Sequence, residues 1–220
     1  MSEAYGAIKP DEELRAPFRD WLAEKWSSER PGLTGLELGE FQLPKSGFSA
    51  KTIFVPVTYQ MEGLSVSDKV VLRIENPEPA VYPQQAPGLD VEIEIQYRSM
   101  ELLEKTGKVP LAKPLGYESD PSVLGQPFFV MAFAKGDVMT EDPAYMEEGF
   151  FAEATPEDQR LIYRRGMQMM VDFHTIDWKD AGFDWLVAPG EEPTVERQID
   201  VWESYMRREL RNRVHKDFDI

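Results

Sequence analysis

The sequence predicts an α+β fold in which a five-stranded antiparallel sheet, with one inserted helix, leads into a group of helices. The first reason is a series of short apolar runs, rich in β-branched residues, between positions 36 and 133. The second is one segment of helical periodicity inside that series, at 90–106. The third is the change to helical periodicity alone after position 137.

The N-terminal part, residues 1–35, is predicted to be a leader with a helix at 10–24. Pro31 and Gly32 are expected to end this part, since both residues interrupt regular structure. We expect the apolar stripe of the helix to pack against the first part of the sheet. That stripe consists of Leu14, Phe18, Trp21 and Leu22.

The sheet and its inserted helix are predicted for residues 36–136. The expected strands are 36–43, 53–59, 69–74, 112–117 and 128–133. Gly63 lies in the turn between the second and third strands, and 118–125 is predicted to be a turn. In the inserted helix, Asp90 is the expected N-cap and Gly107 the expected C-cap. Its apolar stripe consists of Ile93, Tyr97, Met100 and Leu103.

The break at Lys135-Gly136-Asp137 marks a predicted boundary, after which residues 137–220 form the start of an incomplete helical lobe. Residues 140–153 are expected to be loop with a short helix. Thr155 is a predicted N-cap with proline after it, for a helix that ends near residue 176. The expected buried residues of this helix are Ile162, Gly166, Met169, Met170 and Phe173. A last helix at 194–214 is expected to bury Val195, Ile199, Trp202, Met206 and Leu210.

Composition and charge exclude several classes of function. The formal net charge of −16 disfavours nucleic acid or an anionic membrane as a partner, because both require a basic face. The absence of cysteine and the presence of only two histidines exclude thiolate and histidine-rich metal sites. There is neither a signal peptide pattern nor an apolar run of membrane-spanning length. We therefore expect a soluble, cytoplasmic protein; the oligomeric state is not determined, and a dimer is compatible with the sequence.

The segment 46–54 has the layout of a loop that folds over phosphate groups. Gly47 and two serines connect two apolar runs, and a third run carries Arg73. Small residues allow backbone N–H groups to approach phosphates, and a cation neutralises their charge. By itself this pattern is also that of an ordinary hairpin turn.

Six pieces of the sequence, including this segment, resemble the aminoglycoside phosphotransferase family, in the branch related to the kinase-like domains associated with acyl-CoA dehydrogenases. The resemblance spans about 36–214. Its pieces are Ser46-Gly47-Phe48-Ser49-Ala50-Lys51-Thr52, Val71-Leu72-Arg73, Tyr97-Arg98-x-Met100, Leu124-Gly125-Gln126-Pro127-Phe128-Phe129-Val130-Met131, Phe173-His174-Thr175-Ile176-Asp177 and Glu196-Arg197-Gln198. The resemblance implies a protein-kinase-like fold, in which the sheet is the nucleotide-binding N-lobe and the later helices begin the C-lobe.

The resemblance also implies an ATP site, with Mg²⁺ as a second cofactor. The residues of the implied site are Gly47, Phe48, Ser49, Ala50, Thr52, Val71, Arg73, Val130, Met131 and Phe133. The loop residues 47–50 would cover the phosphates, and Arg73 would neutralise them. Residues 131–133 would form the hinge whose backbone groups hydrogen-bond adenine, with Val71 and Val130 near its ring.

The sequence departs from the family pattern at several positions. Ser46 replaces the first loop glycine, and Ala50 replaces the usual asparagine. In the family, an acid of the inserted helix pairs with the cation at the position of Arg73. The uncharged Gln96 occupies the position of that acid, and under another alignment Glu92 or Glu94 would occupy it.

The family's catalytic loop, of the type His-Gly-Asp-x-x-x-x-Asn, is not found in the sequence. His215-Lys216-Asp217 resembles its beginning but follows the last helix directly, so we do not assign a catalytic role to Asp217. His174 and Asp177 are more typical of a helix end than of a catalytic pair. No catalytic residue or metal ligand is assigned, and we expect the chain to stop before the catalytic loop.

The expected function is transfer of the γ-phosphate of ATP to a hydroxyl group of a small molecule. The alternatives are a non-catalytic kinase-like protein that binds a nucleotide or another ligand, and an interaction domain that binds no nucleotide. The sequence does not identify the substrate.

Overall fold

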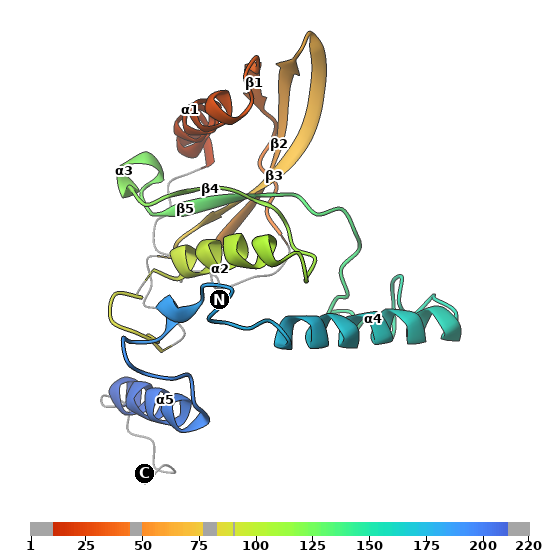
Figure 1. The fold of residues 1–220 in the computed structure, drawn as a ribbon. Coiled ribbons are helices and arrows are strands. Elements are labelled where there is room, and N and C mark those ends of the chain that lie inside the picture. Colours follow the sequence, from red (N-terminus) through yellow and green to blue (C-terminus); the bar gives the residue numbers. More distant parts are fainter. Residues whose placement is uncertain (1–10, 45–49, 77–82, 90, 211–220) are drawn as a thin grey trace.

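The structure is a computed structural model, and it describes residues 11–44, 50–76, 83–89 and 91–210. Its centre is a five-stranded antiparallel sheet with the strand order β1-β2-β3-β5-β4 (Figure 1). The strands are β1 (Thr34–Leu38), β2 (Lys51–Met61), β3 (Leu64–Ile74), β4 (Pro114–Glu118) and β5 (Phe128–Ala132). The predicted five-stranded sheet is therefore confirmed. The boundaries at 35/36 and 136/137 stay predictions.

Strands β2 and β3 form a long hairpin that extends beyond the predicted runs. Their pairing continues from Lys51 opposite Ile74 to Met61 opposite Leu64. Glu62 and Gly63 make the turn, and both have positive φ values, of 51° and 79°. The predicted turn at Gly63 is confirmed. The strands are longer than predicted because backbone pairing continues through polar residues that carry no apolar signal.

Helix α1 (Asp11–Glu29) covers one face of the sheet, as its apolar stripe predicted. Leu14, Phe18, Leu22 and Trp26 are fully buried in it. The helix continues beyond the predicted end at residue 24, because Trp26 packs edge-on against Tyr59 of β2 at 5.6 Å between ring centroids. The buried sheet residues of this core are Leu36, Ile53, Val55, Val57, Tyr59, Val70, Leu72, Ile74, Phe128 and Val130.

Helix α2 (Glu92–Thr106) covers the opposite face of the sheet (Figure 1). A second, smaller apolar cluster lies beneath it. The helix ends at Gly107, which has the left-handed conformation expected of a C-cap (φ 61°). It begins with Val91 as the N-cap residue and without a side-chain cap, while Asp90 lies outside the described residues. The cluster consists of Ala50, Ile93, Phe129, Tyr97, Met100, Tyr117 and Met131.

The predicted turn at 118–125 contains a short helix, α3 (Pro121–Leu124). The Asp120 carboxylate accepts a hydrogen bond from the Ser122 N–H at 2.8 Å, and proline stands at the first helical position. These are the usual start signals of a helix, so the turn prediction was incomplete.

Both outer strands pair irregularly with their neighbours. The register of β1 on β2 shifts between Thr34 and Glu37. The register of β4 on β5 shifts between Pro114 and Gly116, and β4 begins with the proline. Regular pairing is thus confined to the three inner strands.

Up to residue 210, where the described part of the chain ends, three helical elements follow the sheet: α4 (Pro156–His174), η1 (Asp184–Leu186) and α5 (Val195–Leu210). The predicted N-cap of α4 is confirmed, since the Thr155 hydroxyl accepts the Asp158 N–H at 3.2 Å. Residues 140–153 contain turns rather than the expected short helix. Among the described residues, no helix is long and apolar enough to cross a membrane.

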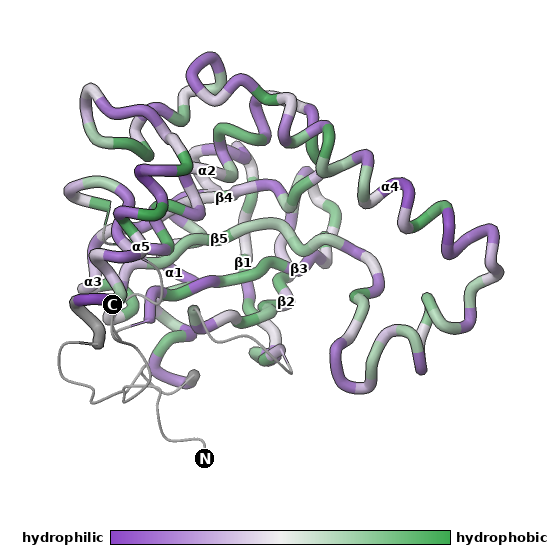
Figure 2. The backbone as a smooth tube through the Cα atoms, turned by 90° about the horizontal axis from the view of Figure 1, so that it is seen from below, coloured by the Kyte–Doolittle hydropathy of each residue, from purple (hydrophilic) through white to green (hydrophobic). Residues whose placement is uncertain are grey.

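The prediction of a buried face on α4 was wrong for most of its residues. Met169, Met170 and Phe173 are 43%, 53% and 49% exposed, whereas Ile162 and Gly166 are half-buried. Helix α4 extends away from the sheet (Figure 2), and Phe173 at its end lines a pocket together with Leu103 of α2. The prediction was also wrong for α5, on which Val195, Ile199, Trp202 and Met206 are exposed. For Leu210 the structure describes no burial.

Candidate functional site

The face of the sheet beneath α2 carries two adjacent rows of paired side chains. Residues directly opposite each other in antiparallel strands share a face, and so do residues two positions apart. One row consists of Thr52, Arg73 and Phe129, and the other of Phe54, Val71 and Met131. Phe129 and Met131 belong to the cluster beneath α2, which identifies the face.

An aromatic pair and a cation lie beside the second row. The Phe54 and Phe133 rings meet edge to face with 5.7 Å between their centroids. The Lys69 ammonium lies 4.8 Å from the centroid of the Phe133 ring, and its Nζ donates to Gln42 Oε1 at 3.4 Å. This end of the face therefore places an aromatic pair next to a positive charge.

Arg73 places a second cation on the same face, in a half-buried position. Burial lowers the pKa of Arg73 from its ordinary value, but an arginine in a protein remains charged near neutral pH. Two positions later, Glu75 accepts a hydrogen bond from the Ile93 N–H at 2.7 Å, which satisfies one of the free N–H groups at the start of α2. Burial, with repulsion by Glu92 as a smaller contribution, raises the pKa of Glu75.

The acids of α2 differ in their partners. Glu94 lies 3.6 Å from Arg98 and accepts a hydrogen bond of 3.5 Å from the Tyr117 hydroxyl. Burial, followed by the charge and the hydrogen bond of Glu94, raises the pKa of Tyr117 to about 12. Within the described residues, one buried oxygen of Glu92 accepts no hydrogen bond. Glu92 therefore has unused hydrogen-bonding capacity, while Gln96 supplies no charge.

Most of the described residues of the predicted site share this face. Thr52, Val71, Arg73 and Met131 lie in the two rows, and Phe133 lies next to them. Ala50 is 5% exposed and belongs to the cluster beneath α2. Three further predicted residues, Gly47, Phe48 and Ser49, lie outside the described residues.

Val130 lies apart from the other predicted residues. It is fully buried among the residues that pack against α1, on the opposite face of the sheet from Met131. Val130 and Met131 are neighbours in β5, so their side chains point to opposite faces of the sheet. Val71 lies opposite Met131, and Val130 therefore cannot contact the same adenine ring as Val71.

The predicted hinge is partly occupied by the sheet itself. The Ala132 N–H donates to the Lys113 carbonyl at 2.8 Å, and the Phe133 N–H donates to the Lys69 carbonyl at 3.2 Å. These two N–H groups are engaged within the protein. A ligand that needs a backbone donor here must find it after Phe133.

Phe54, Lys69 and Phe129 were missed by the sequence prediction of the site. A signal for them existed, since Lys69 and Arg73 alternate with the buried residues of β3, and Phe54 alternates with Ile53 and Val55. What the sequence could not supply is the register that brings the three strands together.

His174 and Asp177, which the sequence analysis considered as a catalytic pair, have separate structural roles. The Asp177 carboxylate accepts the N–H groups of Lys179 at 2.9 Å and of Asp180 at 3.0 Å, as in a local turn. His174 contributes to the wall of a largely apolar pocket of about 620 Å³ formed mainly by aromatic and aliphatic side chains. Asp217 lies outside the described residues.

Among the described residues, no group of three or more histidine, aspartate or glutamate side chains is arranged to hold a metal ion. The apolar rows and Arg73 suit a nucleotide, whose phosphates would themselves supply most of the oxygen ligands of a magnesium ion.

The model of one protein family, the phosphotransferase enzyme family, matches residues 42–219, which is most of the chain. The chain belongs to this family. A crystal structure from Ralstonia eutropha JMP134, of a protein provisionally named an aminoglycoside phosphotransferase, is similar with a TM-score of 0.52 and 24% sequence identity. The similarity covers 86% of this chain and 47% of that one, so the chain spans about half the length of its structural neighbour.

Membership in the phosphotransferase family and this structural similarity confirm the predicted kinase-like α+β fold. The candidate site is therefore the sheet face beneath the inserted helix α2. The described half-buried arginine and apolar rows lie on that face.

Proposed function

We propose that this chain carries the nucleotide-binding part of an ATP-dependent phosphotransferase that acts on a hydroxyl group of a small molecule. The observation that supports this most is the combination of Arg73 with the apolar rows on the face beneath α2. An adenine ring needs flat apolar surface, and a triphosphate needs fixed positive charge. Membership in the phosphotransferase family supports the same reading.

Each part of the face has a role in this proposal. Val71, Met131 and Phe133 contact the adenine, and the backbone after Phe133 offers it hydrogen bonds. Arg73 neutralises the phosphates. Ala50 and Thr52 follow residues 47–49 in the sequence; the predicted role of those residues over the phosphates lies outside the described structure. When ATP is bound, Mg²⁺ would neutralise part of the phosphate charge.

A second candidate function is a kinase-like protein that binds a nucleotide without transferring phosphate. Gln96 favours it, because an uncharged side chain cannot form the ion pair that holds the cation of an active kinase in place. Glu92, with its buried oxygen, is the group that could take over this task. The cytoplasmic location and the acyl-CoA-dehydrogenase-related branch stay predictions.

Binding is tested by calorimetric titration of the chain with ATP and Mg²⁺. We expect Arg73→Met to raise the Kd roughly 10- to 150-fold, which corresponds to loss of a hydrogen-bonded charge worth about 1.5–3 kcal/mol. The control is Arg19→Met, which changes an exposed arginine of α1 that pairs with Asp20 at 2.7 Å. It should bind like the wild type. Equal affinity of both variants, or no binding by the wild type at millimolar ATP, would refute the proposed nucleotide site.

Transfer is tested separately with γ-labelled ATP and a panel of hydroxylated small molecules. Label on an acceptor supports the phosphotransferase. Nucleotide binding without transfer to any acceptor, or to water, favours the second candidate.

A further inference from the structure

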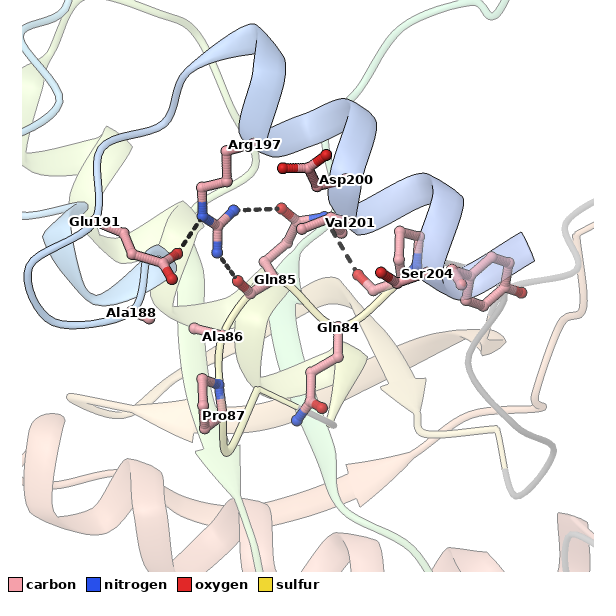
Figure 3. A pocket seen from close by; sticks show the side chains of 12 residues that line it. Gln84, Gln85, Ala86, Pro87, Ala188, Glu191, Arg197, Asp200, Val201 and Ser204 are labelled. Carbon is pink, nitrogen blue, oxygen red and sulfur yellow. Dashed lines mark hydrogen bonds and ion pairs between the residues drawn. The ribbon is translucent and has the colours of Figure 1, made fainter. Parts of the chain in front are cut away.

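Helix α5 is joined to the loop before α2 by a cluster of polar contacts (Figure 3). Arg197 donates through Nη2 to the Gln85 backbone carbonyl and through Nη1 to its side-chain oxygen, at 3.5 Å for the latter. Gln198 donates to the same side-chain oxygen at 2.9 Å. Glu191 accepts from Arg197 Nε at 2.5 Å. These contacts, which we call the Arg197 clamp, connect residues more than a hundred positions apart.

The Arg197 side chain is largely buried, and its partners in the clamp satisfy its charge. The Arg197 side chain is only 13% exposed, whereas that of Glu191 is 51% exposed. A largely buried cation must have partners, and the planar guanidinium can serve a carboxylate and two oxygens of one residue at once. Next to Gln85, Ala86 is buried. The loop at Gln85 is therefore held on α5 rather than lying free on the surface.

The clamp acts on α2 because the loop leads directly into that helix. Gln85 precedes the first residue of α2 by seven positions. The Arg98 guanidinium of α2 lies 3.9 Å from the ring centroid of Trp185, and Lys108 after its end donates to the Thr175 carbonyl at 3.3 Å. The chain after α4 thus makes three contacts along α2: with Gln85 before its start, with Arg98 in its middle and with Lys108 after its end.

On its other side, α2 lies on the candidate nucleotide face. Ile93 is fully buried in the cluster with Phe129, and Tyr97 stacks on Tyr117 at 5.6 Å between centroids. Glu75, two positions after Arg73, accepts the Ile93 N–H. Any displacement of the start of α2 therefore changes the surroundings of Arg73.

We propose that Arg197 is a positioning residue for the nucleotide site. It acts through Gln85, since its clamp fixes the start of α2 against the face that carries Arg73. This inference rests on the proposed function for its effect on nucleotide affinity. The clamp itself does not depend on nucleotide.

The test compares Arg197→Ala with Arg207→Ala in the full chain. Arg207 lies on the same helix but contacts only Glu203, four positions earlier, in the described structure. We expect Arg197→Ala to raise the Kd for ATP with Mg²⁺ about tenfold, in the usual range of coupling between distant sites. Arg207→Ala should leave it within about twofold of the wild-type value.

Hydrogen exchange without nucleotide distinguishes positioning from general loss of stability. In Arg197→Ala, amides of the first two turns of α2 should exchange about tenfold faster, while those of β3 keep their wild-type rates. Equal acceleration in β3 would overturn the inference, because Arg197 would then only stabilise the fold. Unchanged exchange in α2 would overturn it as well.

A double-mutant cycle tests the route through Gln85. Gln85→Ala should weaken nucleotide binding in the same direction, and the double variant should lose less than the sum of the two single losses. Additive losses would refute the route. If the wild type fails to bind ATP, the proposed function is refuted together with the effect on affinity, and the exchange rates still decide whether the clamp holds α2.

Discussion

Replacing Phe18 by alanine should test whether α1 belongs to the sheet domain or is a removable leader. Phe18 is fully buried, packs 6.3 Å from Phe128 between ring centroids, and lies on the face of the sheet opposite Arg73. Alanine would leave a cavity between α1 and β5. If α1 is part of the core, the sheet should lose stability with it.

The size of the effect follows from the buried area. A buried phenylalanine removes about 150 Å² of apolar surface from water, and at about 25 cal/mol per Å² this gives about 4 kcal/mol. The value agrees with the range of about 3–5 kcal/mol for phenylalanine to alanine in cores. For a chain of this size, it corresponds to a melting temperature lower by roughly 8–16 °C.

Urea unfolding followed by tryptophan fluorescence and circular dichroism measures this loss. Phe173→Ala is the matched control, since Phe173 of α4 is 49% exposed and should cost less than about 1 kcal/mol. If Phe18→Ala unfolds at the wild-type urea concentration, or if both variants lose the same stability, α1 does not form the core that we describe.

Three further predictions concern local features. Glu75→Gln should be as stable as the wild type below about pH 4 and increasingly more stable than it as the pH rises. The reason is that burial raises the pKa of Glu75, so the folded state disfavours its ionised form. Urea midpoints of the two proteins should therefore separate between pH 3.5 and pH 8, and a difference that does not change with pH contradicts the prediction. Gly107→Ala should cost about 1–2 kcal/mol, because alanine must adopt φ near 61°, and a calorimetric melt that matches the wild type contradicts this. Thr155→Ala should lower the free energy of unfolding by about 1 kcal/mol, because it removes the acceptor of the Asp158 N–H. Thr155→Ser keeps a hydroxyl acceptor and should retain most of the wild-type stability, and calorimetric melts measure both variants.

The elements that sequence predicts well are those whose apolar pattern is decided locally. The stripe of α1, the five strands and the caps at Thr155 and Gly107 all depend on neighbours within a few positions. Helix α3 was missed, although Asp120 and Pro121 carry its start signals, because a single helical turn has no periodicity to detect.

The burial of α4 and α5 was predicted wrongly for a physical reason. Periodicity identifies the apolar side of a helix, but it does not tell whether an element of the described chain lies against that side. Phe173 and Trp202 have the right spacing and remain 49% and 43% exposed.

The candidate site shows a similar division. Arg73 and Met131, which were predicted from a motif, share one face of the sheet, whereas Val130 lies on the other, because a motif does not say which face each of two neighbouring strand residues occupies. The Arg197 clamp depends on a contact with Gln85 across more than a hundred positions, for which a single sequence offers no signal.

The irregular outer strands have a consequence for association between molecules. A flat, regular edge strand offers a row of unpaired N–H and C=O groups to which another sheet can add. Here both edges are short strands with a shifted register, and one of them starts with Pro114, which has no N–H to offer. Growth of the sheet from molecule to molecule, the step that begins fibrous aggregation, is thereby disfavoured at both sides.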